Sequence, residues 1–174
     1  LFCKYLLSSN LESNCFSLSG SVYSVTEGGA FATITVVRSG GSDGAVSVNY
    51  RTSDGTATSG ADYSSAAGTL NWPDGAAGNR TFEIAILEDA EVETNETINI
   101  SISGAAGGAA VAAPANAVLT ITDNDAAEPG SLQFTTASFA LEESAGSAAI
   151  TVSRSGGTDG AVAIDYATSD GTAT

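Results

Sequence analysis

Residues 21–58 read SVYSVTEGGAFATITVVRSGGSDGAVSVNYRTSDGTAT, and residues 137–174 repeat them as ASFALEESAGSAAITVSRSGGTDGAVAIDYATSDGTAT. The two stretches align without a gap at an offset of 116 residues, and more than half of the aligned positions are identical. This period is too long for a solenoid repeat and matches the size of one all-β domain. The chain therefore reads as one complete module and the first part of a second, taken from a longer tandem array.

Apolar side chains alternate with polar ones in seven short segments of the first copy. Alternation with period two is typical of strands with one buried face. Turns rich in Gly, Asp and Asn separate the segments, as in SGGSDG at 39–44 and PDGAAGN at 73–79. This pattern predicts an all-β fold, an immunoglobulin-like antiparallel β-sandwich of about seven strands followed by a partial second copy. The expected core residues are Tyr23, Val25, Ile34, Val36, Val48, Tyr50, Trp72, Phe82, Ile84, Ile86, Ile100, Leu119 and Ile121.

The chain is expected to divide into four parts. Residues 1–16 mix Leu, Phe, Lys and Cys, unlike the Ala-, Gly-, Ser- and Thr-rich sequence that follows, so we place them outside the fold. Residues 17–125 form the complete module, residues 126–130 the linker AAEPG, and residues 131–174 a truncated second module. Both cysteines, Cys3 and Cys15, lie in the first part, where a disulfide and two free thiols both fit the sequence.

The second copy supplies only three of the expected strands. Three strands drawn from two facing sheets leave an apolar inner face and open strand edges in water. We therefore expect no independently stable domain here. We also expect no second acidic site, because Glu143, which corresponds to Glu27, lacks matching partners. The apolar residues concerned are Phe139, Leu141, Ile150, Val152, Val162, Ile164 and Tyr166.

The charge balance points to cations as partners. The formal net charge is −15, with five Lys plus Arg and no His. A chain so poor in basic residues has no electrostatic footprint for nucleic acid or anionic lipid. It also contains no run of 18 or more apolar residues, so the sequence predicts no direct membrane insertion of this fragment.

Carboxylates collect at strand ends in the complete module. In an antiparallel sandwich, the loops after the first, third and fifth strands lie at the same end as the end of the seventh strand. Four separate acidic segments therefore converge on one tip. Asp54, in the turn sequence SDGT, is open to two readings, a turn former or a ligand. The converging residues are Glu27, Asp62, Glu88, Asp89, Glu91, Glu93, Glu96, Asp123 and Asp125.

Such a concentration of anions indicates a metal site. Each like-charge pair at about 4 Å costs on the order of 1 kcal/mol even in water. A hard divalent cation with six to eight oxygen ligands offsets this repulsion, and Ca²⁺ tolerates irregular loops better than Mg²⁺ does. Because the tip offers neither His nor Cys, Zn²⁺ and Cu²⁺ are disfavoured. The sequence therefore predicts bound Ca²⁺.

The spaced motifs resemble the Calx-beta domain family. They are V-x-Y-x-T-S-D-G-T-A-x-x-G-x-D-Y at 48–63, G-T-L-x-W-x-x-G at 68–75, the acidic run after I-x-I-L, and I-T-D-N-D at 121–125. The resemblance implies calcium ligands at Glu27, at Asp62, in the 88–96 run and at Asp123 and Asp125, with a backbone carbonyl near Glu91. Ala90 and Asn124 stand where the most acidic members have Asp, which implies fewer ions or lower affinity.

The leading functional hypothesis is a non-enzymatic, calcium-binding repeat of a large, secreted or cell-surface adhesion protein. Ca²⁺ would rigidify its junctions with neighbouring repeats, and cell-surface or matrix ligands would be its further partners. The alternative is a calcium-sensing regulatory domain in the cytoplasmic loop of a sodium–calcium exchanger type of transporter. A calcium-independent spacer and a carboxylate-based hydrolase are the other readings. The hydrolase is disfavoured because an exposed tip lacks a substrate cleft.

Overall fold

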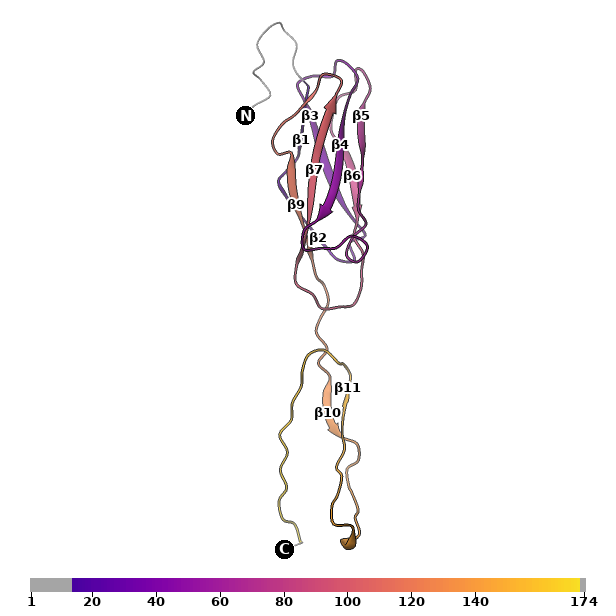
Figure 1. Cartoon of the computed structure of the whole chain (residues 1–174), viewed down its shortest axis with the longest axis vertical. Coiled ribbons are helices and arrows are strands. Elements are labelled where there is room, and N and C mark those ends of the chain that lie inside the picture. Colours follow the sequence, from indigo (N-terminus) through magenta and orange to yellow (C-terminus); the bar gives the residue numbers. More distant parts are fainter. Residues whose placement is uncertain (1–13, 173–174) are drawn as a thin grey trace. The chain divides into compact units, whose positions relative to one another are not determined.

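The computed structural model describes residues 14–172, and the chain divides into two compact units, Leu1–Asp125 and Ala126–Thr174. The first unit is a sandwich of two β-sheets, which confirms the predicted fold class. Figure 1 shows the two layers, with β4, β7 and β9 in front of β3 and β6. Among residues 14–172, no helix is both long and apolar enough to cross a membrane.

The larger sheet has five strands in the order β2-β9-β7-β4-β5. Their bounds are β2 Val22–Thr26, β9 Asn116–Thr122, β7 Glu96–Ala106, β4 Val46–Asp54 and β5 Ala67–Trp72. The β2 strand joins β9 in parallel, whereas the other neighbours are antiparallel. Because β2 and β9 run in the same direction, both strands end at the same end of the sandwich.

The smaller sheet has four strands in the order β6-β3-β1-β8. Their bounds are β6 Arg80–Ala85, β3 Phe31–Ser39, β1 Cys15–Leu18 and β8 Ala110–Val111. The chain thus begins in one sheet as β1 and crosses to the other as β2. At the crossing, the Ser19 amide still donates to the Thr35 carbonyl of the smaller sheet, at 3.0 Å.

The core lies between the two sheets and contains most of the residues that the alternation predicts. Tyr23, Val25 and Tyr50 are only half-buried against this core. The first two lie on β2, an edge strand with one neighbour, and Tyr50 stacks on Phe82 with ring centroids 4.0 Å apart. The predicted core residues that are buried are Ile34, Val36, Val48, Trp72, Phe82, Ile84, Ile86, Ile100, Leu119 and Ile121.

The placement of all residues 1–16 outside the fold is wrong at its C-terminal end. The β1 strand begins at Cys15, and Phe16 is fully buried, with its ring centroid 4.7 Å from that of Trp72. A strand is needed here because β3 would otherwise present an open edge beside the core. Cys15 is buried and disulfide-bonded, whereas Cys3 lies outside the described residues.

The second unit contains a two-stranded sheet, β10 Ser131–Phe134 and β11 Val152–Ser155, and a short 3₁₀ turn, η1 Glu143–Ala145. The pairing of Phe134 with Val152 reproduces that of Leu18 with Val36, at the same offset of 116 residues. The expected strand around residues 162–166 is absent from the described part of this unit. The apolar side chains that the second copy was expected to leave uncovered are all exposed, from Phe139 to Tyr166.

Candidate metal centre

Four chain segments meet at one end of the first unit. They are the turn after β2 (27–30), the loop between β4 and β5 (55–66), the loop between β6 and β7 (86–95), and the residues after β9 (123–125). In Figure 1 this end is the lower end of the sandwich, near the label of β2. The strand directions bring these segments together, because each of the four follows a strand that runs toward this end.

Glu27, Asp123 and Asp125 form the first acidic group. One carboxylate oxygen of each lies within 4.8 Å of one oxygen of each of the others. The parallel pairing of β2 with β9 positions them, since the Glu27 amide donates to the Thr122 carbonyl at 3.0 Å. The side chain of Glu27 is only 6% exposed. Oδ2 of Asp125 is buried and has no hydrogen-bond partner in the described part of the chain.

Asp62, Glu93 and Glu96 form the second acidic group, with the same 4.8 Å limit between their oxygens. The turn in the β4–β5 loop holds Asp62, whose Oδ2 accepts a hydrogen bond from the Thr58 amide at 2.6 Å. The Asp62 carbonyl accepts another from the Leu87 amide at 2.9 Å, which ties this loop to the β6–β7 loop. Burial, and then the hydrogen bond and charge of Asp62, raises the pKa of Glu96 to about 7.

The two acidic groups lie close enough for their charges to interact. The Glu93 amide donates to Oδ2 of Asp123 at 3.1 Å, so the backbone of the second group touches the first. Burial and the neighbouring carboxylates also raise the pKa of Glu27, Glu93 and Asp125 above the ordinary carboxyl value. Every one of these shifts has the sign expected for anions brought together without a counter-charge. A cation bound at this tip would therefore relieve the repulsion between the carboxylates.

Glu88, Asp89 and Glu91 were predicted as ligands and belong to neither group. Asp89 caps its own loop, because its Oδ1 accepts a hydrogen bond from the Glu91 amide at 2.7 Å. The charges of Glu88 and Asp89 still contribute to the raised pKa values of Glu27 and Asp125. Asp54 acts as a turn former, since its Oδ1 accepts hydrogen bonds from the Tyr63 hydroxyl at 2.7 Å and the Ser59 amide at 3.1 Å.

Two further residues shape the first group, and the sequence reasoning missed their roles. The side-chain Nδ2 of Asn124 donates to the Glu27 carbonyl at 3.0 Å and to Oε1 of Glu88 at 3.4 Å. Gly28 has φ 73°, and a Cβ there would lie 2.8 Å from Oε2 of Glu88. An amide at position 124 thus orients the β6–β7 loop where a carboxylate would repel it. The glycine after Glu27 was the available sequence signal for this close approach.

The donor set can hold a hard cation. All six side chains of the two groups offer carboxylate oxygens, which suit Ca²⁺ or Mg²⁺ and not the softer transition metals. The partnerless Oδ2 of Asp125 is the clearest sign, because a buried carboxylate oxygen normally has a partner. A cation beside Asp123 and Asp125 would supply the missing interaction.

Comparison with known proteins gives consistent matches. The family model described as the Calx-beta domain matches residues 12–125 and 125–174. The sodium/calcium exchanger Calx of Drosophila melanogaster is 35% identical over 152 residues, covering 87% of this chain and 16% of the exchanger. The adhesion G-protein coupled receptor V1 of Danio rerio is 35% identical over 100 residues, covering 54% of this chain and 2% of the receptor.

Among solved structures, the apo-form Calx CBD1 domain superimposes with a TM-score of 0.62 and 31% sequence identity. The match covers 66% of this chain and all of that domain. The chain itself spans about a sixth of the length of the exchanger that it matches.

Proposed function

Because this chain belongs to the Calx-beta domain family, we propose that its first unit binds Ca²⁺ at the acidic tip and acts as a calcium-sensing module of a larger membrane transport protein. The observation that carries the proposal is the buried, partnerless Oδ2 of Asp125 inside a group of three carboxylates. Such an oxygen is costly in the absence of a cation and becomes a ligand in its presence.

The six grouped carboxylates are the proposed ligands. Glu27, Asp123 and Asp125 would hold one ion, and Asp62, Glu93 and Glu96 would complete a neighbouring position. Glu88, Asp89 and Glu91 would contribute through charge, through water or, at Glu91, through the backbone carbonyl. Bound Ca²⁺ would supply positive charge that offsets the repulsion between these carboxylates, which contributes to their raised pKa values.

Sensing requires that occupancy of the tip changes something beyond it. Asp125 is the last residue of the first unit, so an ion held by Asp123 and Asp125 would restrain the point from which the second unit continues. The β6–β7 loop would respond as well, because the Glu93 amide bonds Asp123 directly. Calcium would thus order a loop and a domain boundary together.

A transporter context is favoured over a surface repeat by the extent of the match. Similarity to the exchanger runs through both units, whereas similarity to the adhesion receptor covers about half of the chain. A cytoplasmic loop of a membrane protein is the location that goes with this reading. The calcium-binding extracellular adhesion repeat is the second candidate, supported by the match to the receptor and by the tandem modules.

Calcium titration of the full chain by calorimetry, after removal of metal with a chelator, tests the proposal. We expect saturable binding that weakens at least about tenfold in Asp62→Asn and in Asp123→Asn, since each loses a charged ligand. Glu83→Gln is the matched control, because Glu83 is exposed on β6 and belongs to neither acidic group. The site is refuted if the wild-type chain does not bind calcium, or if Asp62→Asn and Asp123→Asn bind calcium with wild-type affinity.

The affinity separates the two contexts. Sensors bind Ca²⁺ with dissociation constants of about 10⁻⁷ to 10⁻⁵ M, and extracellular modules bind it at about 10⁻⁴ to 10⁻³ M. A value in the first range supports the transporter sensor, and a value in the second supports the adhesion repeat.

A further inference from the structure

The outer face of the five-stranded sheet carries no carboxylate on its three central strands. The outward positions of β4, β7 and β9 hold Ser, Thr and Asn, with one Arg, one Val and one Ala. This is unusual in a chain with 20 acidic residues and a net charge of −15. The outward residues are Ser47, Asn49, Arg51, Ser53, Thr97, Asn99, Ser101, Ser103, Ala106, Asn116, Val118, Thr120 and Thr122.

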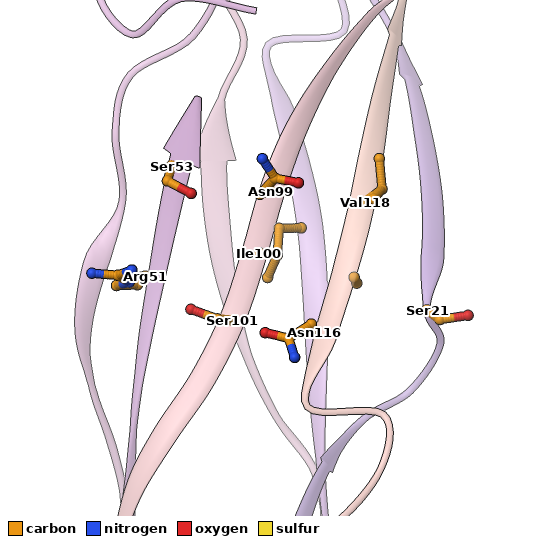
Figure 2. Close-up of a pocket in the computed structure, with 9 residues that line it drawn as sticks. Ser21, Arg51, Ser53, Asn99, Ile100, Ser101, Asn116 and Val118 are labelled. Atoms are coloured by element: carbon orange, nitrogen blue, oxygen red, sulfur yellow. The ribbon is translucent and has the colours of Figure 1, made fainter. Parts of the chain in front are cut away.

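Two rows of these side chains cross the sheet and line a hollow of about 400 Å³. The strand register places Arg51, Ser101 and Asn116 side by side in the first row. In the second row, Ser53 lies beside Asn99, which lies beside Val118. Figure 2 shows Ser101 and Asn116 next to each other on β7 and β9, with Arg51 on β4 on the other side of Ser101.

Arg51 differs from the other arginines that the structure describes. Arg38 and Arg154 donate to backbone carbonyls, and Arg80 lies over the Trp72 ring. Within residues 14–172, the exposed Arg51 guanidinium has neither a hydrogen bond nor an ion pair. The second copy has Ala167 at the matching position. The Arg51 guanidinium is therefore available to bind a ligand.

We propose that this hollow binds a sugar acid, with the carboxylate on Arg51 and the hydroxyl groups over Ser101, Asn116 and the second row. A guanidinium pairs with a carboxylate through two parallel hydrogen bonds. The hydroxyl and amide groups beside it can each donate and accept, which suits the hydroxyls of a sugar ring. The volume is at the lower end of the range for small-molecule sites, and a single hexuronate is a ligand of that scale.

The same surface disfavours the other classes of anionic ligand. The strong negative charge of the chain repels polyanions such as nucleic acids, whereas a ligand with one carboxylate avoids most of this repulsion. A peptide would need either a free strand edge or apolar pockets. The strands concerned are β4, β7 and β9, which all have neighbours on both sides. Val118 is the lone apolar side chain in the two rows, and the other apolar residues that line the hollow, Ile100 and Ala117, are buried.

The test is a titration of the full chain, labelled with ¹⁵N, in the presence of chelator. Excluding calcium separates this site from the acidic tip, because uronates themselves coordinate cations. The probe is D-glucuronate, the neutral control is D-glucose, and the control for a bare carboxylate is acetate. We expect saturable amide shifts confined to β4, β7 and β9, with a dissociation constant on the order of 1 mM for a ligand of this size.

Variants decide whether Arg51 carries the binding. Arg51→Ala should weaken glucuronate binding at least about tenfold, as expected for loss of a charge-assisted pair. Arg80→Gln is the control, since it removes one positive charge elsewhere, and calcium binding at the tip should be unchanged in Arg51→Ala. The proposal is overturned if glucuronate causes no saturable shifts, or if acetate or glucose binds as tightly as glucuronate. It is also overturned if Arg51→Ala binds glucuronate with wild-type affinity.

Discussion

Substitution of Glu96 by Gln should stabilise the calcium-free protein at neutral and alkaline pH. Glu96 lies against Asp62, and its pKa is raised from 4.5 to about 7. The folded state therefore holds a proton between these pH values that the unfolded state has lost. It follows that the calcium-free protein loses stability as pH rises from about 4.5 to about 7. Gln keeps a hydrogen-bond donor toward Asp62 and removes the charge.

The magnitude follows from the same shift. At about 1.4 kcal/mol per pH unit, the raised pKa corresponds to a ceiling of about 3 kcal/mol above pH 7. Glu96 is partly exposed to solvent, and screening lowers the expected gain to about 1–2 kcal/mol. A gain of this size raises the melting temperature of a domain of about 100 residues by about 4 °C or more. At pH 4 the two proteins should melt together, because Glu96 is then protonated in both states.

Thermal unfolding followed by circular dichroism, from pH 4 to pH 8 and with chelator or calcium, measures both effects. Calcium should raise the melting temperature of Glu96→Gln by less than it raises that of the wild type, because the variant has lost one charged ligand. Glu83→Gln, on the exposed face of β6, should change neither property. A raised pKa of Glu96 is refuted if Glu96→Gln is no more stable than the wild type at pH 8 in chelator, or if the gain in stability does not depend on pH.

Three other substitutions or measurements test the fold around the site. Phe16→Ala removes a fully buried ring that packs on Trp72, and it should lower the free energy of unfolding by about 3–5 kcal/mol in urea titrations. Gly28→Ala should destabilise the protein by about 1–2 kcal/mol through its positive φ, and it should weaken calcium binding because the new Cβ meets Glu88. Calorimetry that shows wild-type calcium affinity would contradict a role for this close approach in the site. Hydrogen exchange should be much faster in β11 than in β3, since β11 has a single neighbouring strand and exposed apolar side chains; equal protection would mean that the second unit is stable by itself.

Much of this protein follows from local patterns. Period-two alternation defines the seven main strands, because each strand of a sandwich buries every second side chain. Strand direction then predicts that the acidic segments reach one end, since that depends only on the order of the elements. The repeat also contained the signal for β1 that was overlooked: residues 131–134 (SLQF) align with residues 15–18 (CFSL) at the offset of 116.

The tertiary structure alone decides which of the converging carboxylates meet. Sequence order brings Glu88 and Glu93 to the same tip. The loop conformation then places Glu93 beside Asp62, whereas Glu88 accepts a hydrogen bond from the side chain of Asn124. The row of Arg51, Ser101 and Asn116 is likewise invisible in the sequence, because it depends on the register of three strands that are far apart in the chain. Alternation along a strand specifies a face, whereas neighbours across strands and loops depend on how the whole sandwich packs.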